Sequence, residues 1–428
     1  MGAGRLDIAV AGAGPAGLAA ALLFHRAGHR VTVFERFDRP KPLGSGLILQ
    51  PTGLSVLAAL GLLGEILTLG SRIDRLYGAD ASTGRTVLDV RYDAQPRGRF
   101  GLAVHRAALF LVLHRAVERV GIPVVTSMDI EAADASAAKV RLFGANGLAV
   151  GGFDLVVDAT GARSKLKLYA TYPDEQKPLP YGAFWASLGW RDGFDPHALT
   201  QRYDRASVMI GVLPIGRMAE DGERQAAFFW SLKPAEAEAV RAAGLSAWKQ
   251  RVRSLWPQAE SMLDQIEDFD QLTLARYGHH TLKVPAGRRL AIIGDAAHST
   301  SPQLGQGANM ALLDAAALAS ALEKTSGIEE ALAAYVRSRR LHVRVFQAMS
   351  HVFTPFYQSD STILPFMRDR LVATLAKIPP APQMLAAMVS GTLVDPFTPI
   401  GLTEVDWNAL PEKCDVPASI RKVHNGTV

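Results

Sequence analysis

The sequence predicts an α/β fold, in which a doubly wound, mostly parallel sheet carries an inserted, mostly antiparallel β domain and a C-terminal segment that is helical in part. Three observations predict it. A glycine-rich turn follows a strand-like run at the N-terminus, and a second glycine-rich stretch lies near residue 300. Between them, residues 175–280 change to alternating aromatic runs, which are typical of antiparallel strands. A buried strand-like run returns afterwards, so we expect the first fold to be interrupted and then resumed.

The N-terminal stretch "IAVAGAGPAGLAAALLFHRAGHRVTVFE" predicts a strand, a turn, a helix and a strand in succession. We expect the helix to reach Gly28 and the second strand to end at Glu35. The turn residues expected at a ligand are Gly12, Gly14, Ala16 and Gly17. In a Rossmann-like unit of this kind, the glycines let the backbone approach a pyrophosphate, the helix N-terminus supplies donors, and the terminal acid accepts from a ribose hydroxyl. The unit therefore predicts a dinucleotide-binding site.

The composition argues against several other classes of protein. A hydrophobic fraction of 48% over 428 residues suits one large or two ordinary folded domains, so we do not expect disorder. The net charge of +5 is spread without basic blocks, which argues against nucleic-acid binding. The only cysteine, Cys414, excludes an internal disulfide framework and suits a cytoplasmic protein. The uncharged run over residues 8–24 is interrupted by Pro15 and is too short for a membrane span, so we expect no integral membrane segment.

The hydrophobic periodicity of the rest of the sequence predicts further helices and strands and a division into domains. Helical periodicity over residues 104–120, 305–323 and 328–348 predicts three helices, and "FDLVVDATGARS" (153–164) predicts a buried strand entering a turn at Gly161. The expected domains are the first part of the nucleotide-binding domain at 1–174, the inserted β domain at 175–280, the second part of the nucleotide-binding domain at 281–348, and a helical or irregular segment at 349–428. The side chains expected on the inner face of the inserted sheet, as core and in one or two cases as walls of a substrate pocket, are Trp185, Tyr203, Met209, Phe229 and Trp230.

The stretch "GDAAHSTSPQLGQGAN" (294–309) predicts a second contribution to the ligand site. Asp295 stands at the end of a predicted strand, where ligands of doubly wound folds bind. The residues that open the next helix are Gly305, Gly307, Ala308 and Asn309. Backbone amides at a helix start face groups that accumulate negative charge, and glycine lets such a group come close.

Taken jointly, "GAGPAG" with Glu35 and Arg36, "DATGARS" and "GDAAHSTSPQLGQGAN" resemble the class A flavoprotein monooxygenases, the FAD-dependent aromatic hydroxylases, over about residues 5–345. The resemblance implies non-covalent FAD, with NAD(P)H as a transient reductant. It further implies that molecular oxygen adds to the reduced flavin and that the resulting flavin hydroperoxide hydroxylates an aromatic or otherwise electron-rich small molecule. No motif identifies the aromatic or apolar substrate, and none indicates the oligomeric state.

The same resemblance implies roles for single residues. Asp295 would accept hydrogen bonds from the ribityl chain of FAD, and the amides of residues 305–309 would face the pyrimidine edge of the flavin ring. Arg106 would reach the pyrophosphate, Arg36 would lie near the adenine, and Pro302 would lie beside the reacting edge of the flavin.

Other residues leave alternatives open. His280, or its neighbour His279, is a candidate for relaying a substrate proton, since histidine titrates near neutral pH, and the alternative is a structural pair. The loop "GSGLILQPTG" resembles the family loop beside the flavin ring, with Gly44 and Gly46 permitting a close approach. No cluster of residues has metal-ligand spacing, so we expect no metal site.

Three further functions are alternatives to the hydroxylase. Thr160 stands where the family usually carries an aspartate, which puts the handling of the nicotinamide in question. With the apolar C-terminal stretch, it favours an FAD-dependent reductase of unsaturated, isoprenoid-like lipids. A two-component flavin oxygenase or a halogenase-like enzyme shares the "DATG" form, although the sequence has no Trp-x-Trp-x-Ile-Pro element. A flavin-binding scaffold without turnover is disfavoured, because it has no need for the backbone donors of residues 302–309.

Overall fold

The computed structural model describes residues 4–39 and 45–410. Its first unit consists of β1 (Asp7–Ala11), α1 (Pro15–Arg26) and β2 (Arg30–Phe34). β1 is almost wholly buried, as its uninterrupted apolar run predicts for a strand of a parallel sheet. α1 begins with Pro15 at its first position, where the missing N–H of proline costs no intrahelical hydrogen bond.

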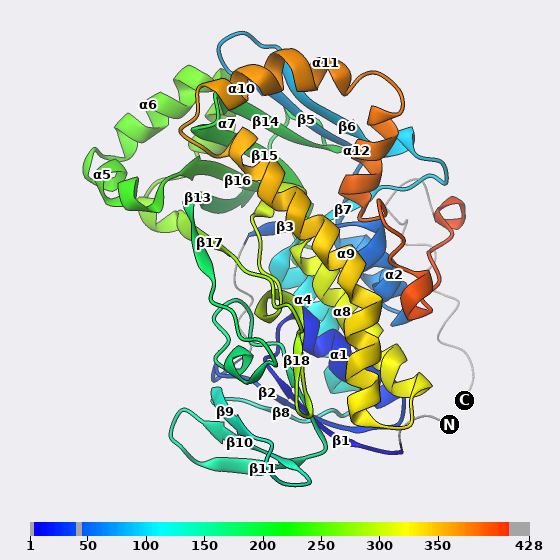
Figure 1. The fold of residues 1–428 in the computed structure, drawn as a ribbon. Coiled ribbons are helices and arrows are strands. Elements are labelled where there is room, and N and C mark those ends of the chain that lie inside the picture. The colour runs from blue at the N-terminus through cyan, green and yellow to red at the C-terminus, as the bar shows by residue number, and fades with distance from the viewer. Residues whose placement is uncertain (1–3, 40–44, 411–428) are drawn as a thin grey trace.

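The first sheet has six strands in the order β18-β19-β12-β1-β2-β8 (Figure 1). Among its described pairings, that of β18 with β19 is antiparallel and the others are parallel. The strands not yet introduced are β8 (Val124–Val125), β12 (Leu155–Asp158), β18 (Ala286–Gly287) and β19 (Leu290–Ile292). β19 therefore brings the late part of the chain back beside β12, after an excursion of more than a hundred residues.

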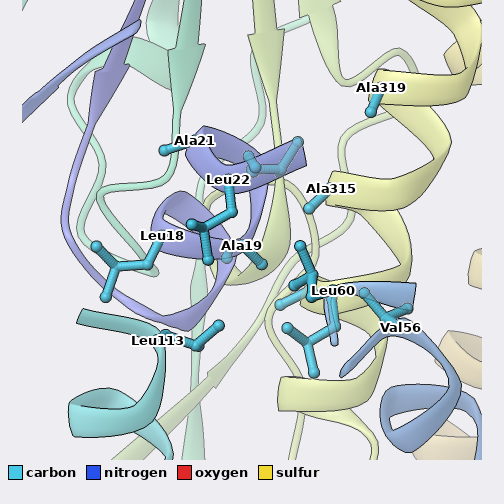
Figure 2. Packing of buried hydrophobic residues seen from close by; sticks show 14 of the residues in the cluster. Leu18, Ala19, Ala21, Leu22, Val56, Leu60, Leu113, Ala315 and Ala319 are labelled. Atoms are coloured by element: carbon cyan, nitrogen blue, oxygen red, sulfur yellow. The ribbon is translucent and has the colours of Figure 1, made fainter. Parts of the chain in front are cut away.

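Several helices form the main core beside this sheet. They include α1, α2 (Pro51–Ala59), α4 (Arg106–Arg119) and α8 (Gly307–Lys324). Figure 2 shows leucines of α1, Leu18 and Leu22, directed into the same core as Val56 and Leu113. Small residues such as Ala19 and Ala315 let the packed helices approach closely. Burial of each leucine stabilises the fold by about 1.5–3 kcal/mol.

A second sheet has seven strands in the order β17-β13-β16-β15-β14-β5-β6, and its pairings are antiparallel except that of β5 with β14. The three predicted aromatic runs form β13 (Lys177–Gly189), β15 (Val208–Gly216) and β16 (Gln225–Leu232). The other strands are β5 (Arg75–Asp80), β6 (Thr86–Arg91), β14 (Ala198–Asp204) and β17 (Thr273–His279). β5 and β6 precede the expected boundary at residue 175, and no aromatic alternation marks them. The division of the chain at residues 174, 280 and 348 stays a proposal.

One face of the seven-stranded sheet is covered by short helices, which Figure 1 shows in green beside it. These are α5 (Ala237–Ala242), α6 (Leu245–Leu255) and α7 (Glu260–Leu263). Trp230 of β16 packs on this side, with its ring centroid 5.9 Å from that of Trp248. The opposite face of the sheet is therefore the one that can border a ligand.

Helix α9 (Ile328–Tyr357) runs past residue 348, where the sequence predicted its end, and contains Pro355 near its last turn. Figure 1 shows it crossing from the six-stranded sheet towards the seven-stranded sheet. Beyond it, α10 (Ile363–Met367) packs against α9. A π-helical turn (Arg368–Val372), α11 (Ala373–Leu375) and α12 (Ala381–Ser390) pack along β6.

Smaller elements complete the described chain. They are α3 (Leu63–Leu69), the sheet of β3 (Gly46–Leu49), β7 (Gly101–His105) and β4 (Ser71–Ile73), and the sheet of β11 (Ala149–Phe153), β10 (Val140–Gly144) and β9 (Ile130–Asp134). None of the described helices combines the length and the apolar character needed to cross a membrane. The doubly wound α/β class with a second, mostly antiparallel sheet is confirmed.

Candidate active site

A cavity of about 570 Å³ lies at the carboxyl ends of β1, β2 and β12. We call it the glycine-lined cavity, and residues 11–16, 34–37 and 159–161 form much of its wall. Strand ends and helix N-termini meet at this edge of a doubly wound sheet, which is where its ligands bind. The predicted ligand-binding residues that line it are Gly12, Gly14, Ala16, Glu35, Arg36, Arg106, Asp295, Gly307 and Ala308.

Two glycines of the N-terminal turn cannot be replaced without moving backbone. Gly12 has φ +102°, and an added Cβ would lie 2.5 Å from the carbonyl oxygen of Ala159. Gly17 does not line the cavity, and a Cβ there would overlap the Gly12 carbonyl oxygen. Gly14, by contrast, has open space around it. The first and third glycines therefore shape the turn, while Gly14 leaves room for a ligand.

Glu35 orders the same turn from the end of β2. Its Oε2 accepts a hydrogen bond from the Ala13 N–H at 2.9 Å, and its Oε1 accepts from the Phe37 N–H at 3.1 Å. The carboxylate is buried but still borders the cavity. Arg36 is exposed, and its guanidinium lies 4.6 Å from the ring centroid of Phe37.

Asp158, at the end of β12, accepts hydrogen bonds from other residues of the "DATGARS" turn. Its Oδ1 accepts from the backbone N–H of Thr160 at 3.0 Å and from the Thr160 hydroxyl at 2.6 Å, while its Oδ2 accepts from the Ser164 hydroxyl. Burial raises the pKa of Asp158, although these hydrogen bonds oppose the effect. The Thr160 hydroxyl is thus engaged within the turn, and Gly161 has φ +83°.

A second cavity of about 490 Å³ adjoins the first, and we call it the aromatic cavity. Side chains from the inner face of the seven-stranded sheet, the loop at residues 300–308 and the C-terminal helices line it. Four of the five predicted inner-face residues are in its wall, namely Trp185, Tyr203, Met209 and Phe229. Trp230 is the exception, because side chains alternate along β16 and it points to the covered face.

The two cavities share five lining residues, which are Leu47, Arg106, Asp295, Gly307 and Ala308. Arg106 is the first residue of α4, whose N-terminus is capped by the His105 side chain accepting from the Ala107 N–H at 3.1 Å. The Asp295 side chain is exposed at this junction and has no hydrogen-bond partner among the residues that the structure describes. The two cavities therefore adjoin at these residues.

The loop at residues 302–309 forms one wall of the aromatic cavity. Pro302 and Gly305 line it, and Gly305 has φ +60°. Asn309 does not line the cavity, because it is wholly buried. Its side chain accepts a hydrogen bond from the Gln50 N–H at 2.8 Å and donates to the carbonyls of Ile48 and Gly305. The Asn309 side chain therefore fixes the backbone of the loop and is not itself available to a ligand.

Several buried amide atoms beside this loop lack a partner in the described chain. They are Nε2 of Gln50, Nε2 of Gln303 and Oε1 of Gln306. All three residues line the aromatic cavity. The Gln50 amide is otherwise well held, because its Oε1 accepts from the Tyr92 hydroxyl at 2.6 Å. Unsatisfied buried donors and acceptors are costly, so these three atoms lower the stability of the loop region unless they gain partners.

The structure does not bring His280 to either cavity. Its Nδ1 lies 2.7 Å from the Ser299 hydroxyl and its Nε2 lies 3.0 Å from the Ala296 carbonyl, so both ring nitrogens are engaged in the interior. Burial lowers the pKa of His280. This placement favours the structural alternative over the proton relay. His279 is likewise outside both cavities.

A buried ionic network lies behind the loop. Asp314 of α8 accepts from the Gly294 N–H at 2.9 Å, pairs with His298 at 2.6 Å and pairs with Arg339 of α9 at 2.8 Å. Burial alone would raise the pKa of Asp314, but the interactions with His298 and Arg339 lower it to about 2. His298 therefore orders the loop that carries Asp295.

Some cavity residues have no sequence motif of their own. They include Gln50, Gln201, Tyr277, Gln358 and Met388, which come from five distant segments. Only Gln50 had a possible signal, since it lies within the stretch expected beside a ring. Gly44 lies outside the described residues. Gly46 lines the aromatic cavity. Across the described residues, no group of His, Cys, Asp and Glu side chains could hold a metal ion.

A glycine-lined cavity at the carboxyl edge of a doubly wound sheet, beside a second cavity with aromatic side chains in its wall, is typical of an enzyme with a dinucleotide cofactor. The family model of the FAD binding domain matches residues 5–349, and the chain belongs to this family. It is an FAD-dependent oxidoreductase of the class A flavoprotein monooxygenases, as the three motifs predict.

Two sequence relatives and one solved structure illustrate the similarity. The FAD-dependent urate hydroxylase of Mycolicibacterium vanbaalenii is 24% identical over 340 residues, which are 78% of this chain and 84% of that protein. The phenazine 1,6-dicarboxylic acid hydroxylase PhzS of Lysobacter antibioticus is 29% identical over 376 residues, covering 78% and 87%. The structure of Klebsiella pneumoniae HpxO complexed with FAD and uric acid has a TM-score of 0.75 at 20% identity and covers 91% of this chain and 98% of that chain. The sequence relatives favour the monooxygenase over the reductase, halogenase and scaffold alternatives.

The residues present fit FAD. The Gly12 turn and the open space at Gly14 suit a pyrophosphate, and the free carboxylate of Asp295 stands where the two cavities adjoin. NAD(P)H is the usual reductant of this family.

Proposed function

We propose that the protein hydroxylates a small, flat aromatic or heteroaromatic compound held in the aromatic cavity, using NAD(P)H and molecular oxygen. The observation that supports the proposal most directly is that the two cavities adjoin at Arg106, Asp295 and Gly307. A cofactor anchored at the N-terminal turn would then have its reacting end beside a compound held among Trp185 and Phe229. The names of the relatives indicate that they act on flat heteroaromatic compounds, urate and a phenazine dicarboxylic acid, which supports the substrate class.

The proposed roles follow from position. Glu35 would bind a ribose hydroxyl, the turn at Gly12–Ala16 and Arg106 would hold the pyrophosphate, and Asp295 would accept from the ribityl chain. Arg36 would lie near the adenine.

The loop supplies the rest of the site. Its backbone amides at residues 305–309 would stabilise negative charge on the cofactor ring, while Pro302 and the aromatic walls keep water away from the substrate. The chemistry that FAD supplies when bound is the passage of two electrons from NAD(P)H to molecular oxygen, with one oxygen atom entering the substrate and the other leaving as water.

The test is to purify the protein, identify the released pigment, and screen aromatic compounds for acceleration of NAD(P)H oxidation. We expect a yellow protein that releases FAD on acid precipitation, and a product that carries one ¹⁸O atom when the reaction runs under ¹⁸O₂. Covalently held flavin, FMN or an oxygen-independent product would contradict the proposal, and the last outcome would favour the lipid reductase. The single cysteine, Cys414, supports a cytoplasmic location as part of this proposal.

A further inference from the structure

A further cavity of about 230 Å³ lies between helix α9 and the connection from β17 to β18, and we call it the basic cavity. The connection contributes Thr281, Leu282, Lys283 and Pro285 to its wall. Helix α9 contributes residues spaced three and four apart, which share one helix face, namely Tyr335, Val336, Arg339, Arg340, Val343 and Arg344. No residue that lines the basic cavity also lines the glycine-lined or the aromatic cavity, so it is separate from the proposed cofactor and substrate sites.

Three exposed cationic residues line the basic cavity, Lys283, Arg340 and Arg344, and among the residues that the structure describes no carboxylate does. Arg340 and Arg344 have neither an ion pair nor a hydrogen bond through their side chains to any other described residue. Nζ of Lys283 lies 4.9 Å from the ring centroid of Tyr172, a contact that leaves its charge unneutralised. Like charges one helical turn apart repel each other, as Arg340 and Arg344 do. The cavity therefore gathers positive charge that no described side chain at its rim balances.

The buried side of the basic cavity does not supply the missing negative charge. Arg339 and His298 line the cavity and are buried, and both contact the same carboxylate, that of Asp314. Nε of Arg339 lies 2.8 Å from Oδ1 of Asp314, so the charge of Asp314 is already matched inside the protein. The positive charge of the three exposed residues is therefore left for a ligand or for counterions from solution.

Both walls of the basic cavity are held in place by hydrogen bonds. The Leu282 N–H donates to the Ala297 carbonyl at 2.9 Å, which ties the connection to the turn after β19. The Tyr335 hydroxyl donates to the Ile292 carbonyl at 2.9 Å, which ties α9 to the end of β19. The backbone of the cavity is thus ordered before a ligand arrives, and binding has to fix only the cationic side chains.

We propose that the basic cavity binds a phosphate group, either as inorganic phosphate or as part of a small phosphomonoester. A guanidinium presents parallel N–H donors that match two phosphate oxygens, and a lysine ammonium supplies a compact positive charge. Arg340 and Arg344 would bind from α9, and Lys283 from the opposite wall. A dianion balances more of this charge than a single carboxylate does, which favours phosphate. The inference goes beyond the proposed function and does not rest on it, because binding here involves no substrate, reductant or oxygen.

The variants remove positive charge from each wall separately. Arg340→Gln combined with Arg344→Gln neutralises the α9 wall, and Lys283→Gln neutralises the opposite wall. Helix α9 supplies a matched control in Arg337, which is also exposed but lines none of the three cavities. All of the replaced side chains are exposed, so each variant should fold and should keep its melting temperature in chloride buffer.

The experiment titrates the FAD-loaded protein by calorimetry with inorganic phosphate and, separately, with glycerol 3-phosphate, at an ionic strength held constant with sodium chloride. Bound FAD keeps either compound out of the glycine-lined cavity. We expect one binding site in the unmutated protein and in Arg337→Gln, and an affinity lower by roughly 10-fold or more in the double variant and in Lys283→Gln. Glycerol 3-phosphate that binds at least as tightly as phosphate would identify an organic phosphomonoester as the ligand, and a preference for inorganic phosphate would identify the free ion.

Three outcomes would overturn the proposal. The first is that the unmutated protein binds neither compound. The second is that Arg337→Gln weakens binding as much as the double variant does, which would show a general attraction to the charge of α9. The third is that Lys283→Gln leaves the affinity unchanged, which would place the ion on the helix surface and not between the two walls. Because turnover is not measured, a failure of this binding and a failure of the hydroxylase proposal are told apart directly.

Discussion

The glycine-lined cavity and the aromatic cavity share a wall at Asp295 and Gly307, yet they are built by different means. The first is made of backbone turns, in which an added Cβ at Gly12 would meet a carbonyl group. The second is made of side chains drawn from segments between residues 45 and 389. A strained turn accepts few residue types, whereas a side-chain wall accepts many of similar volume. We therefore expect changes in the first cavity to abolish cofactor binding and changes in the second to alter which compound binds.

The largest effect is expected behind the shared wall, at Asp314. Asp314→Asn would leave the Arg339 guanidinium buried without its counter-charge and would weaken the hold on the Gly294 N–H. Breaking a buried ion pair in this way typically costs about 3–5 kcal/mol. Chemical denaturation should show this loss of unfolding free energy, and the binding of both FAD and an aromatic compound should weaken. The matched change Glu260→Gln, in the exposed pair with Arg253, should have little effect.

The same pair gives a pH dependence with a definite sign. The pKa of Asp314 is about 2 in the folded protein, below its ordinary value of 3.8. Its contribution to stability is therefore complete above the ordinary value and is lost as the pH falls through about 2. The difference in unfolding free energy between the unmutated protein and Asp314→Asn should shrink over this range. A constant difference down to pH 2 would contradict the assignment.

A pair of glycine substitutions tests whether the first cavity is a backbone structure. Gly12→Ala would add left-handed strain at φ +102° and an overlap with the Ala159 carbonyl, together costing about 3 kcal/mol. Gly14→Ala meets nothing within 4 Å. We expect the first variant to lower the melting temperature of the apoprotein and the second to leave it unchanged, as measured by thermal unfolding without FAD. Equal melting temperatures would show that the turn is more adaptable than its geometry indicates.

Replacing Asp295 should change the affinity for FAD but not the stability of the fold. Because its carboxylate is free in the described structure, Asp295→Asn is expected to leave the melting temperature of the apoprotein unchanged and to weaken FAD roughly 10- to 100-fold. Asp129→Asn is the control, since Asp129 is also exposed and lines the glycine-lined cavity but not the junction. Titration of both apoproteins with FAD decides the point, and equal affinities would count against the role of Asp295.

The contrast between the cavities explains what the sequence could predict. Gly12, Gly14 and Glu35 lie within one local unit, so their spacing alone indicates the strand, the turn and the ligand edge. Helix propensity and apolar period likewise predicted α4, α8 and the start of α9. The backbone conformation of a turn or helix depends on residues that are close together in the sequence. This part of the fold and site could therefore be predicted.

The aromatic cavity could not be anticipated in the same way. Gln50, Tyr277 and Gln358 meet there only because the seven-stranded sheet and α9 bring distant segments together, and an isolated glutamine has no spacing signal. β5 pairs in parallel with β14, and this pairing adds β5 and β6 to the sheet. The contact is long-range, so no local sequence pattern indicates it. His280 was singled out by residue type, yet tertiary packing engages both of its ring nitrogens away from the cavities.

The smallest effect is expected in the wall of the aromatic cavity, at Tyr277. Its hydroxyl accepts a hydrogen bond from Nε1 of Trp185 at 2.8 Å, and Tyr277→Phe would leave that indole N–H unpaired at a cost of about 1 kcal/mol. Burial raises the pKa of Tyr277 to about 12, so the group stays neutral at ordinary assay pH and its removal should not move the pH profile of turnover. FAD affinity should be unchanged, because Tyr277 does not line the glycine-lined cavity, while the KM for an aromatic substrate should rise a few-fold as Trp185 loses its fixed orientation. A shifted pH profile would instead assign Tyr277 a proton-transfer role, and a loss of FAD would show that the two cavities are not as independent as their construction indicates.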